Sequence, residues 1–310
     1  MGYHKVFVAT TTFGQFSSKP MKLLEASNVD YCVNNNGRRL NEEEICDALI
    51  NVDGVIAGTE PYTENVLNHL PKLKVISRLG IGLDNIDMGK TKEKGIKIFS
   101  TETSPAPAVA ELTLGLILDL LRRISFHNSQ MRAGTWKKSM GFLLAGKTLG
   151  IIGLGTIGKK LVETTRGMNL NYLAFDKCED KSFAEENELK YYGLEALIEK
   201  SDIISVHLNL SNETSGLIDS SALEKMKPTA ILINTSRGEC IKEDALKKAL
   251  DGKRLAGAAL DVYSDEPYKG PLLEYDNVIC TPHIGAYACE IRMKMEMEAV
   301  ENLIKGLANE

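Results

Sequence analysis

The chain has 310 residues, of which 43% are hydrophobic and 25% charged, so it can fill two cores of ordinary domain size. Its net charge of −5 and its lack of a basic stripe disfavour nucleic-acid binding. No signal peptide is recognisable, and the longest apolar stretch, residues 108–121, contains two acidic residues and is too short to span a membrane. We therefore expect a soluble, cytoplasmic protein without a membrane or nucleic-acid partner.

Short apolar segments alternate with helical segments along the first hundred residues. Strands are predicted at 5–10, 29–34, 53–58, 73–80 and 95–100, with helices at 19–27, 40–50 and 64–70. This alternation indicates a parallel sheet covered by helices. The strands are almost entirely apolar, as expected when both faces of the sheet are buried.

A second α/β series follows a proline-containing segment, TETSPAPAVAE, that leads into a long apolar helix over about 107–125. Strands are predicted at 147–153, 171–176, 202–208, 230–236, 255–263 and 277–283, with helices up to about 167 and at 195–201 and 243–252. The chain ends in an amphipathic helix over 287–310. The six cysteines form no C-x-x-C pair and none has metal-ligand spacing, so no metal site is predicted.

The motif GLGTIG follows a predicted strand and precedes an apolar-periodic helix. Gly153, Gly155 and Gly158 allow a tight turn and the close approach of a pyrophosphate. The N–H groups of Thr156 and Ile157 lie at the first turn of the helix, where the helix dipole favours phosphate. The motif predicts a dinucleotide site, and the alternative is a purely structural strand–helix turn.

Asp176 lies 18 residues after the last glycine of the motif, at the end of the next predicted strand. A carboxylate there accepts hydrogen bonds from an adenosine ribose and repels a 2′-phosphate, which favours NAD over NADP. The neighbouring Lys177 weakens this preference slightly. The alternative is that Asp176 only caps the end of the strand.

Three polar residues of complementary chemistry also follow predicted strands. Arg237 comes after AILINTS, Glu266 after LDVYSD and His283 after NVICTP. Ligands of open α/β sheets bind beyond the carboxyl ends of the strands, so these side chains are candidates for one site. Taken singly, they could instead be a surface ion pair, a solvated loop acid and a capped loop histidine.

The segments GKTLGIIGLGTIG, INTSRG, ALDVYSDEP and TPHIGA resemble the successive signatures of the D-isomer-specific 2-hydroxyacid dehydrogenase family. RLGIGLDNID and VAELTLGLIL resemble two further family blocks. The resemblance implies that Arg237 grips the substrate carboxylate and carbonyl oxygen, which suits a planar guanidinium. It implies that His283 exchanges a proton with the substrate oxygen and that Glu266 pairs with the other ring nitrogen.

The same resemblance implies further binding residues. Backbone groups of Gly80, Ile81 and Gly82 would hold the substrate carboxylate. The nicotinamide half of NAD would be contacted by residues that follow later strands, namely Leu208, Thr235, Ser236, Asp261, Gly285 and Ala286.

The family resemblance also implies an architecture. A flavodoxin-like substrate domain, residues 1–100 with the C-terminal helix 287–310, would be interrupted by a Rossmann NAD-binding domain over 101–286. Members of the family are usually homodimers, and the segment 107–146, with Trp136, is the expected interface. Ordinary core packing is the alternative for Trp136.

The overall pattern is most similar to short bacterial phosphoglycerate dehydrogenases, partly through GTEPYT followed by ENVL. Some of these enzymes have an arginine for the substrate phosphate at the end of the third strand, where Gly58 stands here. Arg78 could supply a cation or could form a structural ion pair. A glyoxylate/hydroxypyruvate reductase, or another 2-oxoacid reductase, is the alternative. The other class considered is an NAD(H)-sensing scaffold of the corepressor type.

Overall fold

The computed structural model describes residues 3–308, which divide into two compact units. One unit is built from the chain up to Pro105 together with the segment from Tyr287 onward. The other, Ala106–Ala286, is inserted between these two segments. The first junction falls a few residues after the predicted boundary at residue 100, because the long helix α5 (Ala106–Arg122) begins there. The last two residues of the predicted C-terminal helix lie outside the described residues.

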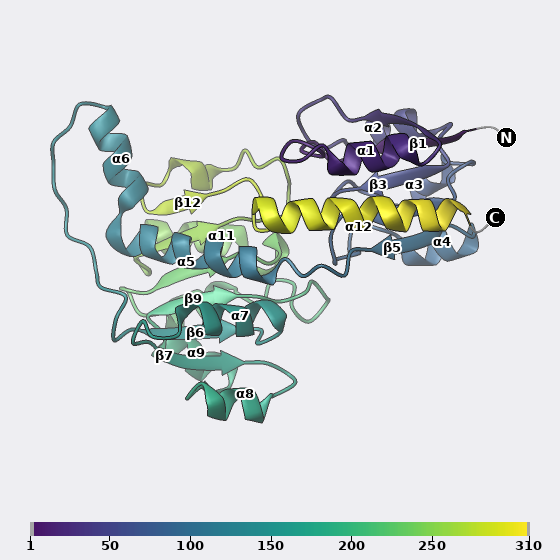
Figure 1. Ribbon diagram of the computed structural model, residues 1–310. Coiled ribbons are helices and arrows are strands. Elements are labelled where there is room, and N and C mark those ends of the chain that lie inside the picture. Colours follow the sequence, from purple (N-terminus) through teal and green to yellow (C-terminus); the bar gives the residue numbers. More distant parts are fainter. Residues whose placement is uncertain (1–2, 309–310) are drawn as a thin grey trace. The chain divides into compact units, whose positions relative to one another are not determined.

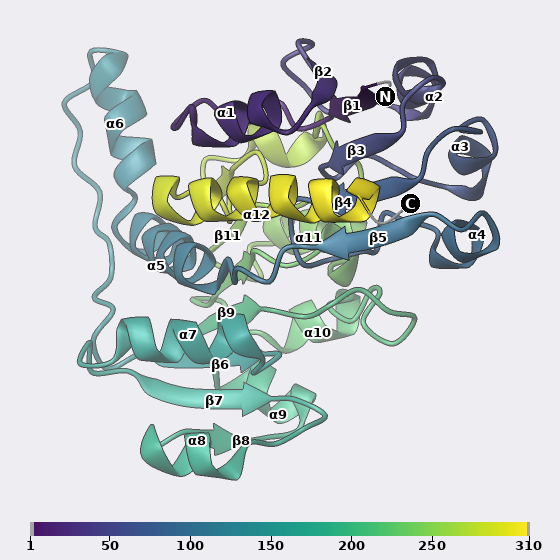
Figure 2. The same cartoon turned by 45° about the vertical axis from the view of Figure 1, so that its right-hand side comes forward.

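The first unit contains a five-stranded parallel sheet of flavodoxin-like order (Figure 1). In spatial order its strands are β2 (Val29–Val33), β1 (His4–Val8), β3 (Gly54–Ala57), β4 (Val75–Arg78) and β5 (Lys97–Ser100). Its helices are α1 (Lys19–Ala26), α2 (Glu42–Leu49), α3 (Glu64–Asn68), α4 (Met88–Glu93) and α12 (Cys289–Ala308). The C-terminal helix therefore packs on strands from the opposite end of the sequence, as Figure 2 shows.

Two glycines bring α12 close to this sheet. A Cβ atom on Gly54 would lie 2.8 Å from a methyl group of Leu303, and one on Gly306 would lie 2.7 Å from a methyl of Val75. Since successive side chains of a strand point to opposite faces, Val55 faces away from α12 and joins the core beneath α2 and α3. Both faces of the sheet are thereby buried.

The second unit contains a seven-stranded parallel sheet with the Rossmann strand order extended by one strand. In spatial order the strands are β12 (Val278–Cys280), β11 (Gly257–Leu260), β10 (Ile231–Asn234), β9 (Ile203–Val206), β6 (Thr148–Ile152), β7 (Asn171–Phe175) and β8 (Lys190–Tyr191). Its helices are α5, α6 (Ile124–Arg132), α7 (Thr156–Thr165), α8 (Lys181–Glu186), α9 (Leu194–Lys200), α10 (Ser220–Lys225) and α11 (Glu243–Asp251). The neighbouring strands β9, β10 and β11 are buried along their whole length.

The single helix predicted over 107–125 was wrong at its C-terminal end. Helix α5 ends at Arg122, and Arg123 adopts a left-handed conformation with φ of 55°. A second helix, α6, then begins at Ile124, where the Asp119 carboxylate accepts a hydrogen bond of 2.7 Å from the Ser125 backbone N–H. An acidic side chain from one helix thus satisfies a free N–H at the start of the next.

Neither a membrane span nor a metal centre is apparent among the described residues. No helix within residues 3–308 is both long and apolar enough to cross a membrane. Within the same range, no three His, Cys, Asp or Glu side chains are grouped so that they could hold a metal ion.

A buried ion pair ties α12 to the loop after β1 in the first unit. The Arg292 and Glu296 side chains are both almost fully buried, and Nε of the arginine donates to Oε1 of the glutamate over 3.0 Å. Arg292 also donates to the Thr12 hydroxyl, and Glu296 accepts from the Gly14 N–H over 3.0 Å. Burial raises the pKa of Glu296, and these donors oppose that shift.

Arg292→Met should destabilise the protein by about 3 kcal/mol, because it leaves the buried Glu296 carboxylate without its cation. The double variant Arg292→Met/Glu296→Met should recover most of that loss, since it removes both charges. Urea unfolding of the wild type and the variants measures the free energies. Equal stabilities of the single and double variants would contradict this account of the pair.

Candidate active site

The polar residues predicted to form a site gather at the carboxyl edge of the second sheet. Strand order in this sheet reverses between β6 and β9, which lie side by side although two strands separate them in sequence. At such a switch point the loops leave neighbouring strands in opposite directions and open a crevice for ligands. Residues that follow β6, β7, β9, β10, β11 and β12 all lie at this edge.

The glycine motif forms the turn between β6 and α7. Gly153 has φ of 96°, and a Cβ atom on it would lie 2.4 Å from the His207 carbonyl oxygen. A Cβ on Gly158 would lie 2.4 Å from the Gly153 oxygen, so both positions require glycine for packing. Gly155 does not require glycine for packing, because it is exposed and nothing lies within 4 Å of a Cβ built there. Thr156 begins α7 and is exposed, and the first N–H groups of a helix have no partner within the helix.

Asp176 follows β7 and reaches the glycine turn. Its carboxylate accepts hydrogen bonds from the Leu154 N–H over 2.7 Å and from the Cys178 N–H over 2.9 Å. Leu154 is the second residue of the motif, so the acid and the glycine turn share one hydrogen-bonded arrangement. The structure therefore brings the predicted ribose and pyrophosphate residues together.

The other residues predicted to bind the cofactor also follow strands of this edge. Leu208 comes after β9, Thr235 and Ser236 after β10, Asp261 after β11, and Gly285 and Ala286 after β12. His207 is held by its backbone N–H to the Ile152 oxygen and by its ring to the Ser205 hydroxyl, 2.8 Å away. Burial lowers the pKa of His207 to about 4, so this ring is neutral near neutral pH.

Glu266 and His283 meet in a direct contact. The Nδ1 atom of His283 lies 3.1 Å from Oε1 and 3.0 Å from Oε2 of Glu266. The side chain of Glu266 is 17% exposed and that of His283 36% exposed, so the pair faces solvent mainly through the imidazole. Oε1 of Glu266 also accepts from the Tyr263 N–H over 3.2 Å. The carboxylate thereby fixes the ring orientation through Nδ1 and leaves Nε2 outside this contact.

The turn that carries His283 is organised by Asp261, which is 1% exposed. The Asp261 carboxylate accepts from the Thr281 hydroxyl over 2.6 Å and from the N–H groups of Ile284 and Gly285, each over 2.8 Å. Burial raises the pKa of Asp261, and these three donors oppose that shift. His283 itself has φ of 54°, a conformation that non-glycine residues adopt only where their surroundings impose it.

Arg237 leaves the turn after β10, beside the residues that follow β11. Its Nη1 donates to the Ser236 carbonyl over 2.7 Å. The next residue, Gly238, is packed so tightly that a Cβ atom would lie 2.0 Å from the Tyr263 carbonyl carbon. The turn that carries Arg237 therefore contacts the segment that carries Glu266, the partner of His283.

Gly80, Ile81 and Gly82, predicted to bind the substrate, belong to the first unit, on the loop after β4. Gly80 has φ of 145°, and a Cβ atom there would lie 2.8 Å from Nη1 of Arg78. That guanidinium also donates to the Leu79 carbonyl, so it packs against its own loop.

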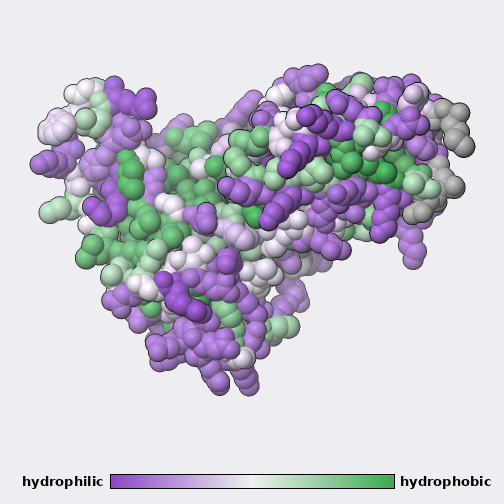
Figure 3. Space-filling model, viewed as in Figure 1, coloured by the Kyte–Doolittle hydropathy of each residue, from purple (hydrophilic) through white to green (hydrophobic). Residues whose placement is uncertain are grey.

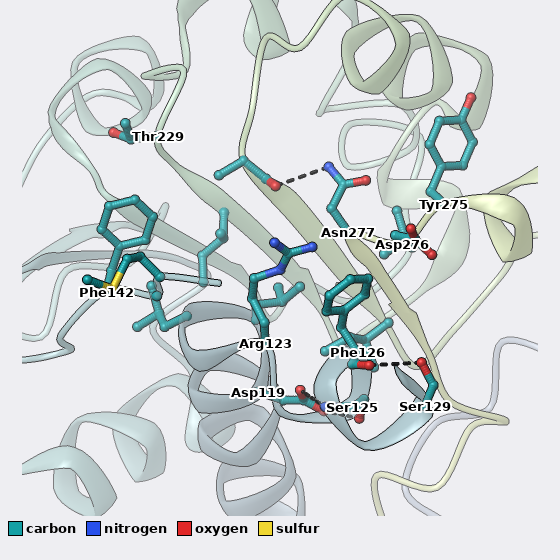
Figure 4. Close-up of a pocket in the computed structure, with 18 residues that line it drawn as sticks. Asp119, Arg123, Ser125, Phe126, Ser129, Phe142, Thr229, Tyr275, Asp276 and Asn277 are labelled. Atoms are coloured by element: carbon teal, nitrogen blue, oxygen red, sulfur yellow. Dashed lines mark hydrogen bonds between the residues drawn. The ribbon is translucent and has the colours of Figure 1, made fainter. Parts of the chain in front are cut away.

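A separate cavity of about 510 Å³ lies in the second unit, between the start of α6 and the β12 edge of the sheet (Figure 4). The Arg123 guanidinium lies 4.1 Å from the centre of the Phe126 ring, and Asn277 donates to the Ala256 carbonyl over 3.0 Å. None of the predicted catalytic residues lines this cavity.

Large apolar side chains are exposed on α6 and on the segment after it, and two of them, Met140 and Phe142, line this cavity. Figure 3 shows hydrophobic residues gathered over α5 and its junction with α6. No residue of α6 is buried. The exposed apolar residues of α6 and the following segment are Ile124, Met131, Trp136, Met140, Phe142 and Leu143.

Comparison with known proteins places these observations in one family. Residues 114–285 match the model of the D-isomer specific 2-hydroxyacid dehydrogenase NAD-binding domain. The chain is 36% identical to a hydroxypyruvate reductase of Thermotoga maritima, over 86% of this chain and 89% of that protein. It is 38% identical to a glyoxylate reductase of Thermococcus litoralis, over 79% and 77% of the two chains. A phosphoglycerate oxidoreductase from Vibrio cholerae superposes with a TM-score of 0.90 at 28% identity, covering 99% and 100%.

The chain belongs to the D-isomer specific 2-hydroxyacid dehydrogenase family, as predicted from its motifs. It is an NAD-dependent oxidoreductase that acts on the CH–OH group of 2-hydroxyacids. The residues present fit the cofactor, since the space above Gly155 and the free N–H groups of α7 are open to a pyrophosphate. When bound, NAD supplies the hydride acceptor of this reaction.

Two polar residues at this edge of the sheet were not predicted from the sequence, although a signal for them was present. Asn234 and Thr281 were not predicted as functional, although each is a polar residue at or just after the end of a buried strand. Asn234 is hydrogen-bonded within the turn that leads to Arg237, and Thr281 donates to Asp261.

Gly155→Ala should impair cofactor binding, whereas Gly153→Ala should impair stability. The first should fold normally and weaken NADH binding by about tenfold, roughly the loss of one charge-assisted hydrogen bond. The second should destabilise the fold by about 2 kcal/mol or more, because its Cβ meets the backbone of residue 207. Fluorescence titration with NADH and thermal unfolding separate the two effects. Unchanged NADH affinity in Gly155→Ala would contradict the assignment of this turn to the pyrophosphate.

Proposed function

We propose that Arg237, Glu266 and His283 carry out the reaction, with a 2-oxoacid or D-2-hydroxyacid as substrate. The observation that supports this most directly is the contact of His283 Nδ1 with both carboxylate oxygens of Glu266 at the carboxyl edge of the sheet. A neutral or protonated imidazole with one nitrogen anchored to an acid is suited to move a proton at its other nitrogen.

In the reducing direction, Arg237 binds the substrate carboxylate and its carbonyl oxygen through the planar fork of its guanidinium. His283 donates the proton on Nε2 to the carbonyl oxygen as a hydride arrives at C2, so the products are a D-2-hydroxyacid and a neutral imidazole. Glu266 holds the ring and stabilises its protonated form before the transfer. The reverse reaction uses the same groups, with His283 accepting the proton.

The remaining binding residues are assigned in the same way. The glycine turn with Thr156 and Ile157 binds the pyrophosphate, and Asp176 binds the adenosine ribose, which favours NAD over NADP. The nicotinamide half is bound by the residues after the later strands: Leu208, Thr235, Ser236, Asp261, Gly285 and Ala286. The backbone of residues 80–82 binds the substrate carboxylate.

Two candidate substrates are supported, each by a different observation. D-3-Phosphoglycerate is supported by the sequence pattern around GTEPYT and by the similarity to the phosphoglycerate oxidoreductase. Glyoxylate or hydroxypyruvate is supported by the end of β3. A Cβ atom on Gly58 would lie 2.8 Å from the carboxylate of Glu60, which is only 3% exposed. The buried Glu60 carboxyl group thus occupies the space into which a phosphate-binding side chain at residue 58 would have to extend, so the geometry favours the unphosphorylated substrate.

The chain also has a surface suited to a homodimer. Six large apolar residues of α6 and of residues 136–143 are exposed, and two of them, Met140 and Phe142, line a cavity in the same unit. Monomeric proteins rarely leave a contiguous apolar patch of this kind in water. We assign this surface to a second copy of the chain.

Arg237→Lys should lower kcat/KM for 2-oxoacids by about 100-fold, nearly as much as Arg237→Ala, since a lysine keeps the charge but loses the bidentate fork. NADH affinity should change less than twofold. The measurement is steady-state kinetics with glyoxylate, hydroxypyruvate, phosphohydroxypyruvate and pyruvate, each with NADH and NADPH. Wild-type turnover by the lysine variant would rule out a bidentate role.

His283→Ala and Glu266→Gln complete the same experiment. His283→Ala should remove most of the turnover while NADH still binds, because only the proton donor is lost. Glu266→Gln should retain a small fraction, since an amide can orient the ring but carries no charge. Asp265→Asn, a change in the adjacent acid, is the matched control and should remain near wild type.

Phe142→Asp should convert the dimer to monomers, because it places a charge on the apolar surface around the cavity. Light scattering coupled to gel filtration measures the mass. Phe16→Asp is the matched control, since Phe16 is similarly exposed, at 56% against 53%, but lies in the first unit. A monomeric wild type, or a Phe142→Asp protein that remains dimeric, would exclude this surface as the interface.

A further inference from the structure

A buried amide ends the central strand β10. The strand is apolar from Ile231 to Ile233, and Asn234 then follows with only 1% of its surface exposed. Burying an amide in a sheet costs free energy unless its donor and acceptor are both satisfied. The hydrogen bonds of Asn234 therefore indicate what the residue does.

All of these side-chain bonds go to the turn that carries Arg237. Oδ1 of Asn234 accepts from the Ser236 N–H over 3.0 Å and from the Ser236 hydroxyl over 2.8 Å. Nδ2 donates to the Arg237 carbonyl over 2.8 Å. The amide thus closes the turn at both of its ends, with its acceptor toward Ser236 and its donor toward Arg237.

The structure assigns Asn234 as a positioning residue for Arg237, an inference that rests on the proposed role of that arginine. The amide fixes the backbone from which the guanidinium extends, and so sets where its fork can meet a carboxylate. An aspartate could not replace it, because a carboxylate has no donor for the Arg237 carbonyl and would face that oxygen with a like partial charge.

The backbone is held on both sides of this turn, and the Asn234 amide acts between these two points. Downstream, Gly238 is pressed against the Tyr263 backbone, and the Cys240 N–H donates to the Arg237 carbonyl over 3.2 Å. At the strand end, the Asn234 carbonyl accepts from the Asp261 N–H over 2.9 Å. Between these fixed points the Asn234 side chain bonds to Ser236 and to the Arg237 carbonyl, while Thr235 is held through its hydroxyl, 3.1 Å from that of Thr113. A long arginine amplifies a small backbone rotation, and a displacement of about 1 Å is enough to cost on the order of 100-fold in rate.

The test compares Asn234→Asp and Asn234→Ala with the wild type. Both variants should raise KM for the best 2-oxoacid substrate at least about tenfold, by misplacing the carboxylate-binding group. The inhibition constant of oxamate, a 2-oxoacid analogue, should rise in parallel in the presence of NADH. The dissociation constant of NADH should stay within twofold. Circular dichroism defines a temperature at which every variant is folded, and kinetics are measured there. Asn171→Asp, at the amino end of β7 where the residue is exposed, is the matched control.

A double-mutant cycle distinguishes positioning from a general structural effect. In an Arg237→Ala background, Asn234→Asp should change kcat/KM less than about twofold, because the group that it positions is gone. An additive loss in that background, an equal weakening of NADH and oxamate, or a wild-type KM in Asn234→Asp would each overturn the inference. If Arg237→Ala itself retains the wild-type KM, the proposed role of Arg237 fails, and this inference fails with it.

Discussion

In a parallel sheet all strands end at one edge, and the polar chemistry of the second unit depends on that constraint. Strands β9, β10 and β11 are buried throughout, so they carry no chemistry themselves. The segments that follow them leave from neighbouring positions on this edge. Arg237, Glu266 and His283 can therefore come from segments nearly fifty residues apart and still lie on neighbouring turns.

Buried polar side chains at the strand ends hold these turns in place. Asp261 binds the turn of His283 through three hydrogen bonds, and Asn234 binds the turn of Arg237 through another three. Each is nearly inaccessible to water, so its bonds are not exchanged for bonds to solvent. Such support is what allows His283 to keep a left-handed backbone conformation that costs free energy.

The second unit bears on the type of reaction, whereas the first unit bears on the identity of the substrate. The second unit matches the model of the NAD-binding domain and contains the residues proposed for proton transfer, a step common to all 2-oxoacids. Relatives with different names, a hydroxypyruvate reductase and a glyoxylate reductase among them, are similarly close to this chain in sequence. A fold and its catalytic groups therefore do not identify the substrate. The arrangement of Gly58 and Glu60 in the first unit is the feature that bears on it.

The sequence by itself determined the family, the α/β class, the first strand series and the second except for the two-residue strand β8, because apolar periodicity and glycine motifs are local properties. It did not reveal the break at Arg123, where Asp119 caps a new helix. Nor did it reveal the roles of Asn234 and Asp261 in holding turns. The role of Asp261 depends on partners about twenty residues along the chain that only the folded sheet brings within reach, such as Thr281, which donates to it over 2.6 Å. Asn234 bonds to the nearby Ser236 and Arg237, but its burial at the strand end is decided by the packing of the sheet. The type of a residue and its place at the end of a strand can be predicted from the sequence. Which polar groups are buried, and against what, is decided by tertiary packing.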